Sequence, residues 1–540
     1  MKHPSTTHAR WLSGIALLAS AATVAAGVPA VAATTPGATT PSTTVAEHGT
    51  TKPGGLAGKV KVREVMKHLA RFDAIGDRHG DRSAGTPGYR VSRNYVVKRL
   101  QRAGYKPQVQ AFDFAYFAQL APSVFEQTSP TPTTYEEDSD NGYALMTYSG
   151  SGDVTAPVQP VDLSLGDPAA STSGCEAADF EGFTAGNIAL IQRGACAFAD
   201  KVVNAQDAGA TGVIVMNQGT PGRFDAFSGT LSNPVGTVPA IGTTFAIGES
   251  LASGEAEVHL AASTESDIRE TWNVLAETKG QRRNTVMAGA HLDSVQGANG
   301  VNDNGSGSGA LLAVAEKLAE QKRKPTNRVR FAWWGAEELG LKGSRHYVDD
   351  LATNRPRRFQ QIALYLNFDM VASPNYALMV YDGDNSAYPV GPGAAEGPEG
   401  SGAIERMFHR FFDRLGTGSD ESAFSGRSDY GPFIELNVPA GGLFTGAEGI
   451  KTEEQAVQFG GTAGEAYDPC YHAACDDMTN LSRRALRANT AAIAHMVARF
   501  ARSTRAVNGD STGHEPPAEP RHAHAHPRHQ HRHAEDPVKR

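Results

Sequence analysis

The sequence predicts an α/β fold built on a mostly parallel, mixed sheet that helices flank, with a β-rich segment inserted into it. Between about residues 271 and 503, short apolar strands alternate with amphipathic helical windows, a pattern typical of a parallel sheet covered on both faces. Between about 122 and 262, short strands bounded by turn residues follow one another and basic residues are few. At 540 residues the chain is too long for a single core, so two domains with flanking segments are expected.

The composition indicates a folded protein without a nucleic-acid partner. Hydrophobic residues make up 40% of the chain and charged residues 20%, which is ordinary for a soluble globular protein and allows a large core. The formal net charge of -8 argues against binding to nucleic acid. We expect a monomer.

Both ends of the chain differ in composition from its middle. Residues 1–32 have the basic start, apolar run and A-V-A sequence of a secretory signal peptide, and no later run is long enough to cross a bilayer. We therefore expect a secreted, extracellular protein with no membrane contact once the signal is removed. Residues 33–54, rich in Thr, Ala, Pro and Gly, are expected to be a linker or a removed pro-segment. Residues 504–540 are expected to be a disordered His-rich tail, with metal scavenging as the less favoured role.

The folded region is expected to consist of one α/β domain interrupted by the insertion. Residues 55–121 contain two helical windows, at 60–72 and 89–103, and an alternating strand at 105–117. These belong with residues 263–503, which leaves 122–262 as the insertion. Further strands are predicted at 272–278, 284–288, 328–334, 362–368, 377–381 and 438–444, and helices at 310–321, 343–350, 402–415 and 486–501.

The insertion holds a strand–helix–strand unit but no residue set that looks catalytic. Its strands at 187–191 and 212–216 flank a helix at 197–208. The stretch I-A-L-I-Q-R-G and the residues that follow it resemble the protease-associated domain, a small β-rich module inserted in several secreted peptidases. The alternative is an independent binding or spacer module.

Four cysteines in an exported chain are expected to form disulfides, with three possible connectivities. Proximity in sequence favours Cys175 with Cys196 and Cys470 with Cys475. The alternative for C-Y-H-A-A-C is a zinc knuckle, which is disfavoured because a closed structural zinc site needs four ligands.

Four predicted strands are followed by polar side chains typical of a metal or substrate site. Because the carboxyl ends of parallel strands meet at one edge of a sheet, we expect these side chains to converge there. They are His291, Asp293 and Asp303 after the strand at 284–288, Glu337 and Glu338 after 328–334, Asp369 after 362–368, and Tyr471 and His472 in the loop beyond 438–444.

This combination of side chains suits zinc. Mixed nitrogen and oxygen ligands are typical of zinc sites, and two metal ions can share a bridging carboxylate and a bridging hydroxide. A five-ligand set for two zincs per chain is His291, Asp303, Glu338, Asp369 and His472. The remaining carboxylate, Glu337, is then the predicted general base that takes the proton of the bound water.

The motifs of the α/β domain resemble those of the two-zinc secreted bacterial aminopeptidases of leucyl aminopeptidase type, which have the zinc-dependent exopeptidase fold. The match covers essentially the whole α/β domain and includes H-L-D-S-V, N-D-N-G-S-G, W-W-G-A-E-E-L-G-L-K-G-S, L-N-F-D-M, G-R-S-D-Y, G-G-L-F-T-G and C-Y-H-A-A-C. The implied roles are ligands of one metal for His291 and Asp369, ligands of the other for Glu338 and His472, bridging for Asp303, base for Glu337, hydrogen bonding to the oxyanion for Tyr471, and orientation of His291 for Asp293.

The resemblance also implies how a substrate would be held. Gly426 and Arg427 would help to hold the N-terminus and backbone of the peptide, and Phe444 would form a wall of the first side-chain pocket. Glu337 and Asp369 would face the ammonium group of a peptide with a free N-terminus. A cis peptide bond after the bridging Asp303 is implied, and the Cys470–Cys475 pair matches a family disulfide. The insertion, absent from minimal members, and Tyr430 beside a pocket residue are departures from the pattern.

The sequence thus predicts a secreted zinc aminopeptidase that releases N-terminal residues, with a preference for large apolar side chains. One alternative is another hydrolase on this fold, such as a carboxypeptidase or an aminoacylase. The other is a non-enzymatic receptor, which is disfavoured because all five ligands and the base are present.

Overall fold

The computed structural model describes residues 53–514 apart from residues 138–139 and 254. The predicted signal peptide, nearly all of the linker and most of the His-rich tail lie outside the described residues. Within the described range, no helix is both long enough and apolar enough to cross a membrane.

A mixed sheet organises the α/β domain. The four strands at its centre, β14, β11, β9 and β10, run parallel to one another, while β8 and β12 pair antiparallel with β10 and β14. The predicted mostly parallel, mixed sheet is therefore confirmed. In spatial order its strands are β13 (Asp420–Ser422), β12 (Met379–Tyr381), β14 (Ala440–Phe444), β11 (Ile362–Phe368), β9 (Gln281–His291), β10 (Asn327–Trp334) and β8 (Glu257–Glu277).

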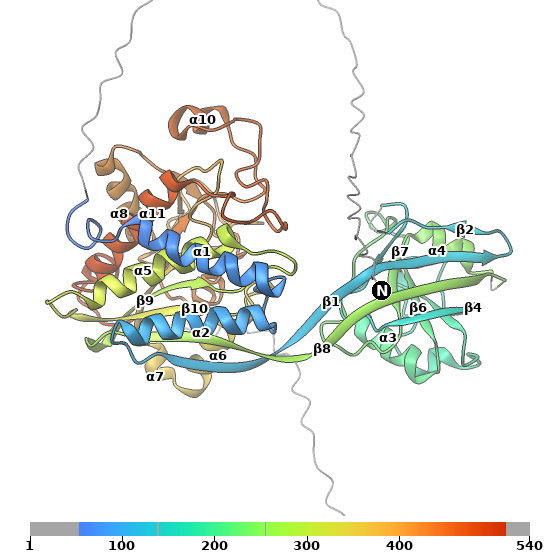
Figure 1. Ribbon diagram of the computed structural model, residues 1–540. Coiled ribbons are helices and arrows are strands. Elements are labelled where there is room, and N and C mark those ends of the chain that lie inside the picture. The colour runs from blue at the N-terminus through green and yellow to red at the C-terminus, as the bar shows by residue number, and fades with distance from the viewer. Residues whose placement is uncertain (1–52, 138–139, 254, 515–540) are drawn as a thin grey trace, which may run out of the picture. The chain divides into compact units, whose positions relative to one another are not determined.

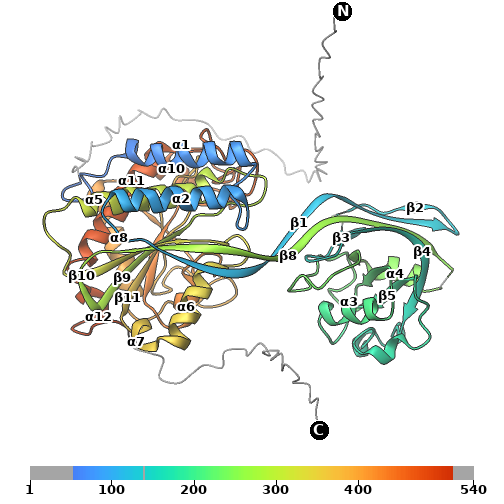
Figure 2. The ribbon, with the colours of Figure 1, turned by 60° about the horizontal axis from the view of Figure 1, so that its bottom comes forward.

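Helices cover both faces of this sheet (Figures 1 and 2). From Leu364 on, alternate residues of β11 point to opposite faces, so that Leu364 and Leu366 join one buried cluster while Tyr365 joins another. Ile362 precedes a register shift and lies in the cluster of Tyr365. A strand buried on both faces is expected to be apolar, and β11 is so apart from Asn367, whose side chain is hydrogen-bonded to Tyr365 and Ser428. The first cluster is covered by α1 (Val62–His79), α2 (Pro87–Arg102), α5 (Gly307–Ala319), α8 (Ser401–Leu415) and α11 (Arg483–Phe500), and the second by α6 (Lys342–Asn354), α7 (Pro356–Phe359) and α9 (Gly431–Glu435).

Two strands are much longer than the sequence suggested. β1 (Gln108–Ser129) pairs antiparallel with β8 from Gln108 opposite Leu275 to Ser129 opposite Glu257. The strands predicted at 105–117 and 272–278 are correct but short, because both strands continue through the expected boundaries at 121 and 262. Register shifts near Gln119, Ala121 and Val124 interrupt the alternation of side chains, and that alternation was the pattern used to predict the strand.

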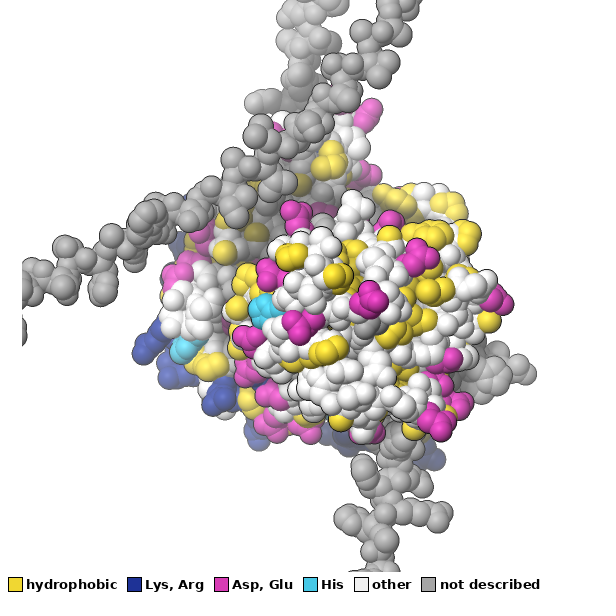
Figure 3. All heavy atoms as spheres, turned by 90° about the vertical axis from the view of Figure 1, so that its right-hand side faces the viewer, with side chains coloured by type: hydrophobic (Ala, Val, Ile, Leu, Met, Phe, Trp, Pro, Cys, Tyr) yellow, Lys and Arg dark blue, Asp and Glu magenta, His cyan; other side chains and the backbone are white. Residues whose placement is uncertain are grey.

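The insertion continues from this strand pair as a second set of strands. The order β8-β4-β5-β6-β7-β3 includes three parallel pairs, and the predicted strand–helix–strand unit is found as β5, α3 and β6. One face is drawn in Figure 3, where acidic side chains are scattered among hydrophobic and uncharged ones and Lys and Arg are sparse in front. The elements are β3 (Tyr143–Leu145), β4 (Gly152–Val161), β5 (Ile188–Gln192), α3 (Phe198–Asp207), β6 (Gly212–Met216), β7 (Ala240–Thr243) and α4 (Phe245–Leu251).

The start of the predicted disordered tail is folded. Residues 505–508 form the short helix α12 (Arg505–Asn508), and His514 is buried with Nδ1 2.8 Å from the carbonyl oxygen of Ile362. The His514 ring also packs edge-on against Phe359. The expected boundary at 504 is thus about ten residues too early, because His514 packs against Phe359 and is hydrogen-bonded to Ile362 of the domain.

Candidate metal centre

The predicted site residues meet at the carboxyl edge of the central strands. Trp334 pairs with His291, and Phe368 pairs with Leu443, so that β9, β10, β11 and β14 end side by side. The side chains that follow these strand ends form what we call the central cluster: His291, Asp303, Glu337, Glu338, Asp369 and His472.

One half of the central cluster is built around His291. Its Nε2 lies 3.2 Å from Oδ1 of Asp303 and 3.1 Å from Oδ1 of Asp369. Oε2 of Glu337 is farther away, at 3.9 Å. This difference separates the two nearer carboxylates, which the sequence predicts as ligands, from Glu337, which it predicts as the base.

The other half is built around His472. Its Nε2 lies 3.4 Å from Oδ2 of Asp303 and 3.1 Å from Oε2 of Glu338. Asp303 therefore presents one carboxylate oxygen to each imidazole, which is the arrangement expected of a carboxylate that bridges two metal ions. The imidazole of His472 is held in part by Tyr471, whose ring stacks on it with centroids 3.8 Å apart.

Asp293 contacts residues of both halves of the central cluster: His291 and the backbone of Glu337 in one, and the backbone of Glu338 in the other. Its carboxylate accepts hydrogen bonds from the backbone N–H groups of Glu337 and Glu338, each at 3.3 Å. Nδ1 of His291 lies 3.2 Å from the carbonyl oxygen of Asp293 and 3.7 Å from its carboxylate. The imidazole is thus oriented mainly by the carbonyl group, while the carboxylate fixes the turn that carries the two glutamates.

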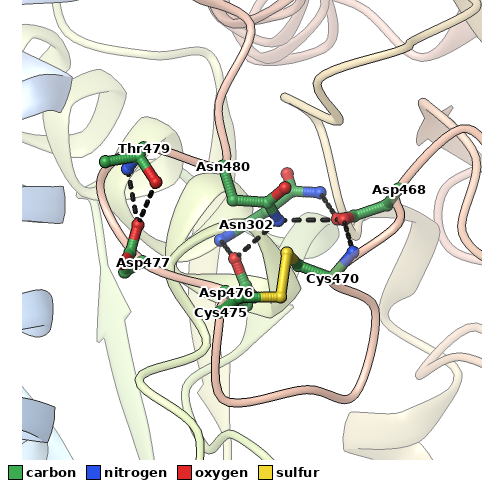
Figure 4. Close-up of a disulfide and its surroundings, with 8 residues drawn as sticks. All are labelled: Asn302, Asp468, Cys470, Cys475, Asp476, Asp477, Thr479 and Asn480. Atoms are coloured by element: carbon green, nitrogen blue, oxygen red, sulfur yellow. Dashed lines mark hydrogen bonds between the residues drawn. A yellow bond between two sulfur atoms is a disulfide. The ribbon is translucent and has the colours of Figure 1, made fainter. Parts of the chain in front are cut away.

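Asp476 anchors the loop that carries Asp303. Its carboxylate accepts hydrogen bonds from the backbone N–H groups of Asn302, at 2.8 Å, and Asp303, at 2.9 Å. The side chain of Asn302 donates to Asp468 at 2.6 Å, and the Cys470–Cys475 disulfide closes the short loop between Asp468 and Asp476 (Figure 4). The peptide bond between Asp303 and Asn304 is cis, as the resemblance implied.

Arg82 braces the same loop from the side of α1 and α2. Its fully buried guanidinium donates to the carbonyl oxygens of Leu292, Asn299 and Gly300 at 2.5, 2.7 and 2.6 Å. Gly300 adopts a φ of 59°, and a Cβ there would lie 2.4 Å from the carbonyl oxygen of Asp303. A glycine is therefore required where the loop turns toward the cluster.

The electrostatics of the central cluster favour a bound cation. Burial raises the pKa of Glu338 to about 8, and the charge of Asp303 adds to that rise. Burial also raises the pKa of Glu337 well above its ordinary value. For His291, burial would lower the pKa, but Asp369 and Glu337 outweigh it and raise the pKa well above the ordinary value.

Within the described part of the chain, one carboxylate oxygen of the central cluster lacks a hydrogen-bond partner, and a cation could take the place of that partner. Oε1 of Glu338 is buried and has no hydrogen-bond partner among the described residues. A buried carboxylate oxygen without a partner is costly unless a cation satisfies it. Two imidazole nitrogens among at least four carboxylates therefore fit divalent metal ions of the zinc type.

A pocket of about 320 Å³ opens from the central cluster, and its wall is largely aromatic and apolar. The predicted pocket residue Phe444 lines it, together with Met370, Met379, Tyr381 and Tyr430. The hydroxyl of Tyr430 accepts a hydrogen bond from the backbone N–H of Gly426 at 3.0 Å. Tyr430, which stood out as a departure from the family pattern, thus shapes the wall and also holds the Gly426 loop.

Arg427 extends from that loop toward Tyr471. Its guanidinium donates to the phenol oxygen of Tyr471 at 3.1 Å and to Glu448 at 2.6 Å. Burial raises the pKa of Tyr471, as does the nearby charge of Asp303, so the phenol keeps its proton. All of the predicted catalytic and substrate residues therefore lie in or beside one pocket.

Sequence reasoning missed three groups that position the site. Arg82 and Asp476 hold the Asp303 loop, and Ser428 donates from Oγ to Oδ2 of Asp369 at 2.5 Å. Ser428 lies inside the G-R-S-D-Y motif and Asp476 directly follows Cys475, so both stand next to features that had been noted. Arg82 lies more than 200 residues before the loop that it contacts, and no local pattern marks it.

Comparisons with known proteins show which families the two parts of the chain match. Residues 273–497 match the model of Peptidase family M28, and residues 154–251 match the PA domain. The chain is 45% identical over 507 residues to an aminopeptidase of Pseudomonas aeruginosa, with 92% of each chain covered. It is 40% identical over 458 residues to leucine aminopeptidase 2 of Trichophyton tonsurans, covering 83% of this chain and 86% of that protein.

Two solved structures have the same fold. An aminopeptidase from Aneurinibacillus sp. strain AM-1 is 25% identical, with a TM-score of 0.56 over 85% of this chain and 97% of that one. A zinc aminopeptidase from Bacillus subtilis is 22% identical, with a TM-score of 0.52 over 83% of this chain and 97% of that one.

Proposed function

The chain belongs to peptidase family M28 and is a metalloaminopeptidase, and on that premise we propose that it is a secreted, zinc-dependent enzyme that releases large apolar N-terminal residues from peptides. The observation that carries this proposal is the placement of Asp303 between two imidazoles, with Glu337 beside them at the mouth of an aromatic pocket.

The central cluster would hold two zinc ions. His291 and Asp369 would bind one, Glu338 and His472 the other, and Asp303 both. When bound, zinc ions polarise a substrate carbonyl group and lower the pKa of a bound water molecule.

Glu337 would act as the general base and then as the general acid. Its carboxylate is buried and lies farther from His291 than the proposed ligands do, which leaves Oε2 available to take the proton of the attacking water. The same proton would then pass from Oε2 to the leaving amine nitrogen. Asp293, by holding the backbone N–H of Glu337, fixes where that carboxylate stands.

Tyr471 would donate a hydrogen bond from its hydroxyl group to the oxygen of the substrate carbonyl as negative charge develops there, and would keep its proton. Arg427 donates to the phenol oxygen at 3.1 Å, so that the O–H proton of Tyr471 remains available for the substrate. Because the paired Arg427 is itself exposed at the rim, it can also contact the peptide backbone.

Selection of a free N-terminus would come from negative charge close to the scissile bond. Glu337 and Asp369 would face the ammonium group, and Ser428 would keep Asp369 in place. The side chain of the released residue would enter the pocket lined by Met370, Met379 and Phe444, which favours large apolar groups.

The organisation of the chain follows the sequence prediction. We propose a signal peptide at 1–32, a linker or pro-segment at 33–54, a peptidase domain in two parts at 55–121 and from 263 to about 514, and a protease-associated insertion at 122–262. The matches at 154–251 and 273–497 lie inside these limits and support them. The proposed partners are peptides with a free N-terminus, and the proposed state is a secreted monomer.

A pair of matched substrates tests this function. The enzyme should release p-nitroaniline from leucine p-nitroanilide, lose that activity after treatment with a chelator, and regain it when zinc is added. N-acetyl-leucine p-nitroanilide, in which the ammonium group is blocked, should not be cleaved. Cleavage of the acetylated compound with no action on the free amine would show an aminoacylase-like or endopeptidase activity instead.

A further inference from the structure

A second group of histidine and carboxylate side chains lies between α8 and β13. Glu405 and His409 are four residues apart on α8, so they project from one face of the helix, and Glu421 reaches them from β13. Each of the three offers a ligand atom within 4.8 Å of the others. We call this set the α8 cluster; it shares no residue with the central cluster.

The separations within the α8 cluster do not correspond to hydrogen bonds. Nε2 of His409 lies 3.9 Å from Oε1 of Glu405 and 3.7 Å from Oε1 of Glu421. Hydrogen bonds between such atoms would be about 2.7–3.2 Å long. Two ligands of one tetrahedral ion, with bonds of about 2.0–2.2 Å, stand roughly 3.3–3.6 Å apart, so a small contraction around an ion would suffice.

Two polar atoms of the α8 cluster are buried and unsatisfied within the described residues, although the side chains of His409 and Glu421 are 22% and 25% exposed as a whole. Nε2 of His409 and Oε2 of Glu421 are buried and have no hydrogen-bond partner in the described part of the chain. The side chain of Glu405 is only 5% exposed. Its Oε2 accepts from the backbone N–H groups of Gly383 and Asp384, and its other oxygen is the one directed at His409. Buried polar atoms in folded proteins nearly always have a partner, so this arrangement points to a ligand.

The imidazole of His409 is oriented as a metal ligand is. Its Nδ1 lies 2.8 Å from Oγ of Ser419, and when Nδ1 donates that hydrogen bond, the lone pair of Nε2 faces the two glutamates. Burial raises the pKa of Glu421 to about 7, and the charges of Asp382 and Glu405 add to the rise, so the cluster carries an excess of acidic groups.

We propose that the α8 cluster is a binding site for one divalent transition-metal ion of the zinc class, held by His409, Glu405 and Glu421. An imidazole with two carboxylates suits zinc or its first-row neighbours, whereas calcium and magnesium prefer oxygen ligands throughout. This site is separate from the reacting centre and does not depend on the function proposed for it.

The bound ion would fasten the outer strand of the sheet to α8. β13 is a three-residue strand whose partner in the sheet is β12. Its residues Glu421 and Ser422, and Ala423 directly after it, line the substrate pocket. An ion shared by α8 and β13 would hold that wall of the pocket in place. The ion would therefore have a structural role and would stabilise the fold.

The test is a count of bound zinc in His409→Gln, which removes the nitrogen ligand from a residue outside the substrate pocket. Chelator-stripped wild type and variant are titrated with Zn²⁺ by calorimetry, and the variant should bind one zinc fewer per chain. Zinc should also raise the unfolding temperature of the wild type more than that of the variant. His495→Gln is the matched control, because this half-buried histidine packs on Phe411 rather than against carboxylates, and it should keep the wild-type stoichiometry.

Only the difference between variant and wild type matters, so the result does not depend on how many zincs the central cluster or the histidines of the tail bind. Equal stoichiometry with equal affinities in wild type and His409→Gln would overturn the proposal and leave the cluster as a buried proton-sharing group. Should His409→Gln fail to fold, Ser419→Ala decides: it should weaken one zinc site by about 10–100-fold. Unchanged affinity at every site in Ser419→Ala would overturn the proposal equally.

Discussion

The central cluster and the α8 cluster consist of the same types of side chain, histidine and carboxylate, in two different structural settings. In the central cluster, parallel strand ends bring five proposed ligands and a base to the mouth of a pocket, where a substrate can reach them. In the α8 cluster, one helix and one short outer strand supply three potential ligands that lie close to one another and are only partly exposed. The comparison indicates that an ion at the sheet edge would be catalytic, because a substrate can reach it. An ion between the helix and the strand would be structural, because it would hold the two elements together.

A third group, around Glu316, shows what happens when the protein supplies the cation itself. Arg99 forms two hydrogen bonds to the Glu316 carboxylate, at 2.6 and 2.8 Å, and His68 lies 3.6 Å from it. Here the guanidinium neutralises the carboxylate, so no ion is needed. The two clusters proposed to bind metal have no arginine in that position.

The largest expected effect in the central cluster is on turnover. Glu337→Gln removes the proton acceptor but leaves the five proposed ligands, so kcat for leucine p-nitroanilide should fall by about 10²–10⁴-fold. Bound zinc, measured by mass spectrometry of the metal content, should not change. Turnover equal to that of the wild type would rule out Glu337 as the base, and a loss of zinc would make it a ligand.

The next effect concerns Arg82, which braces the central loop with three hydrogen bonds and has no arginine counterpart in the α8 cluster. Arg82→Met leaves three buried carbonyl groups of the central loop without a donor, so the free energy of unfolding should fall by about 3 kcal/mol or more. Denaturant unfolding of the chelator-treated protein measures this loss. Arg90→Met on the exposed side of α2 is the control and should change the free energy by less than about 0.5 kcal/mol. Equal effects for the two variants would mean that Arg82 does not brace the loop.

Glu316 predicts a dependence of stability on pH that does not involve zinc. Burial raises the pKa of Glu316, but the nearby His68 and the hydrogen bonds from Arg99 outweigh it and lower the pKa to about 2 from an ordinary 4.5. The folded-state pKa lies below the unfolded one, so the contribution is fully present above about pH 4.5 and is lost as the pH falls toward 2.

Glu316→Gln should accordingly reduce the free energy of unfolding by on the order of 2–3 kcal/mol at pH 7. Denaturant titrations between pH 7 and pH 3 should show the difference from wild type shrinking below pH 4.5, with or without zinc. A difference that stays constant to pH 3 would contradict the assigned cause.

A smaller effect is expected from the anchor of the Asp303 loop. Asp476→Asn keeps the shape of the side chain but weakens the two hydrogen bonds from the backbone of Asn302 and Asp303, so zinc affinity at the central cluster should fall by about 10–100-fold. Competition with a chromogenic chelator measures this affinity. It is the counterpart of Ser419→Ala in the α8 cluster, and each variant should weaken only its own site.

Much of the centre could be predicted from local sequence, because each central strand is a short apolar run followed at once by its functional side chain. His291, Glu337, Glu338 and Asp369 stand within a few residues of strand ends, and parallel strands bring such ends together. The cis peptide and the roles of Tyr471 and Arg427 came from the family resemblance. Proximity in the sequence was enough to favour both Cys175 with Cys196 and Cys470 with Cys475, and the structure contains both disulfides.

The contacts that could not be predicted join segments far apart in the chain. Arg82 reaches carbonyl groups more than 200 residues away, and backbone acceptors leave no mark on a sequence. The α8 cluster was missed for a similar reason, since Glu405 and His409 look like an ordinary polar helix face until β13 folds Glu421 against them. The predicted lengths of β1 and β8 were too short, because register shifts interrupt the alternation of side chains and are visible only from the strand pairing.

The central claim is that Asp303 lies between two zinc ions, and anomalous X-ray diffraction at the zinc edge tests it most directly. Crystals of the zinc-loaded protein should show two peaks in the central cluster, one beside His291 and Asp369 and one beside Glu338 and His472, with one Asp303 oxygen on each. A single peak in this cluster, or a peak coordinated by Glu337, would contradict the account.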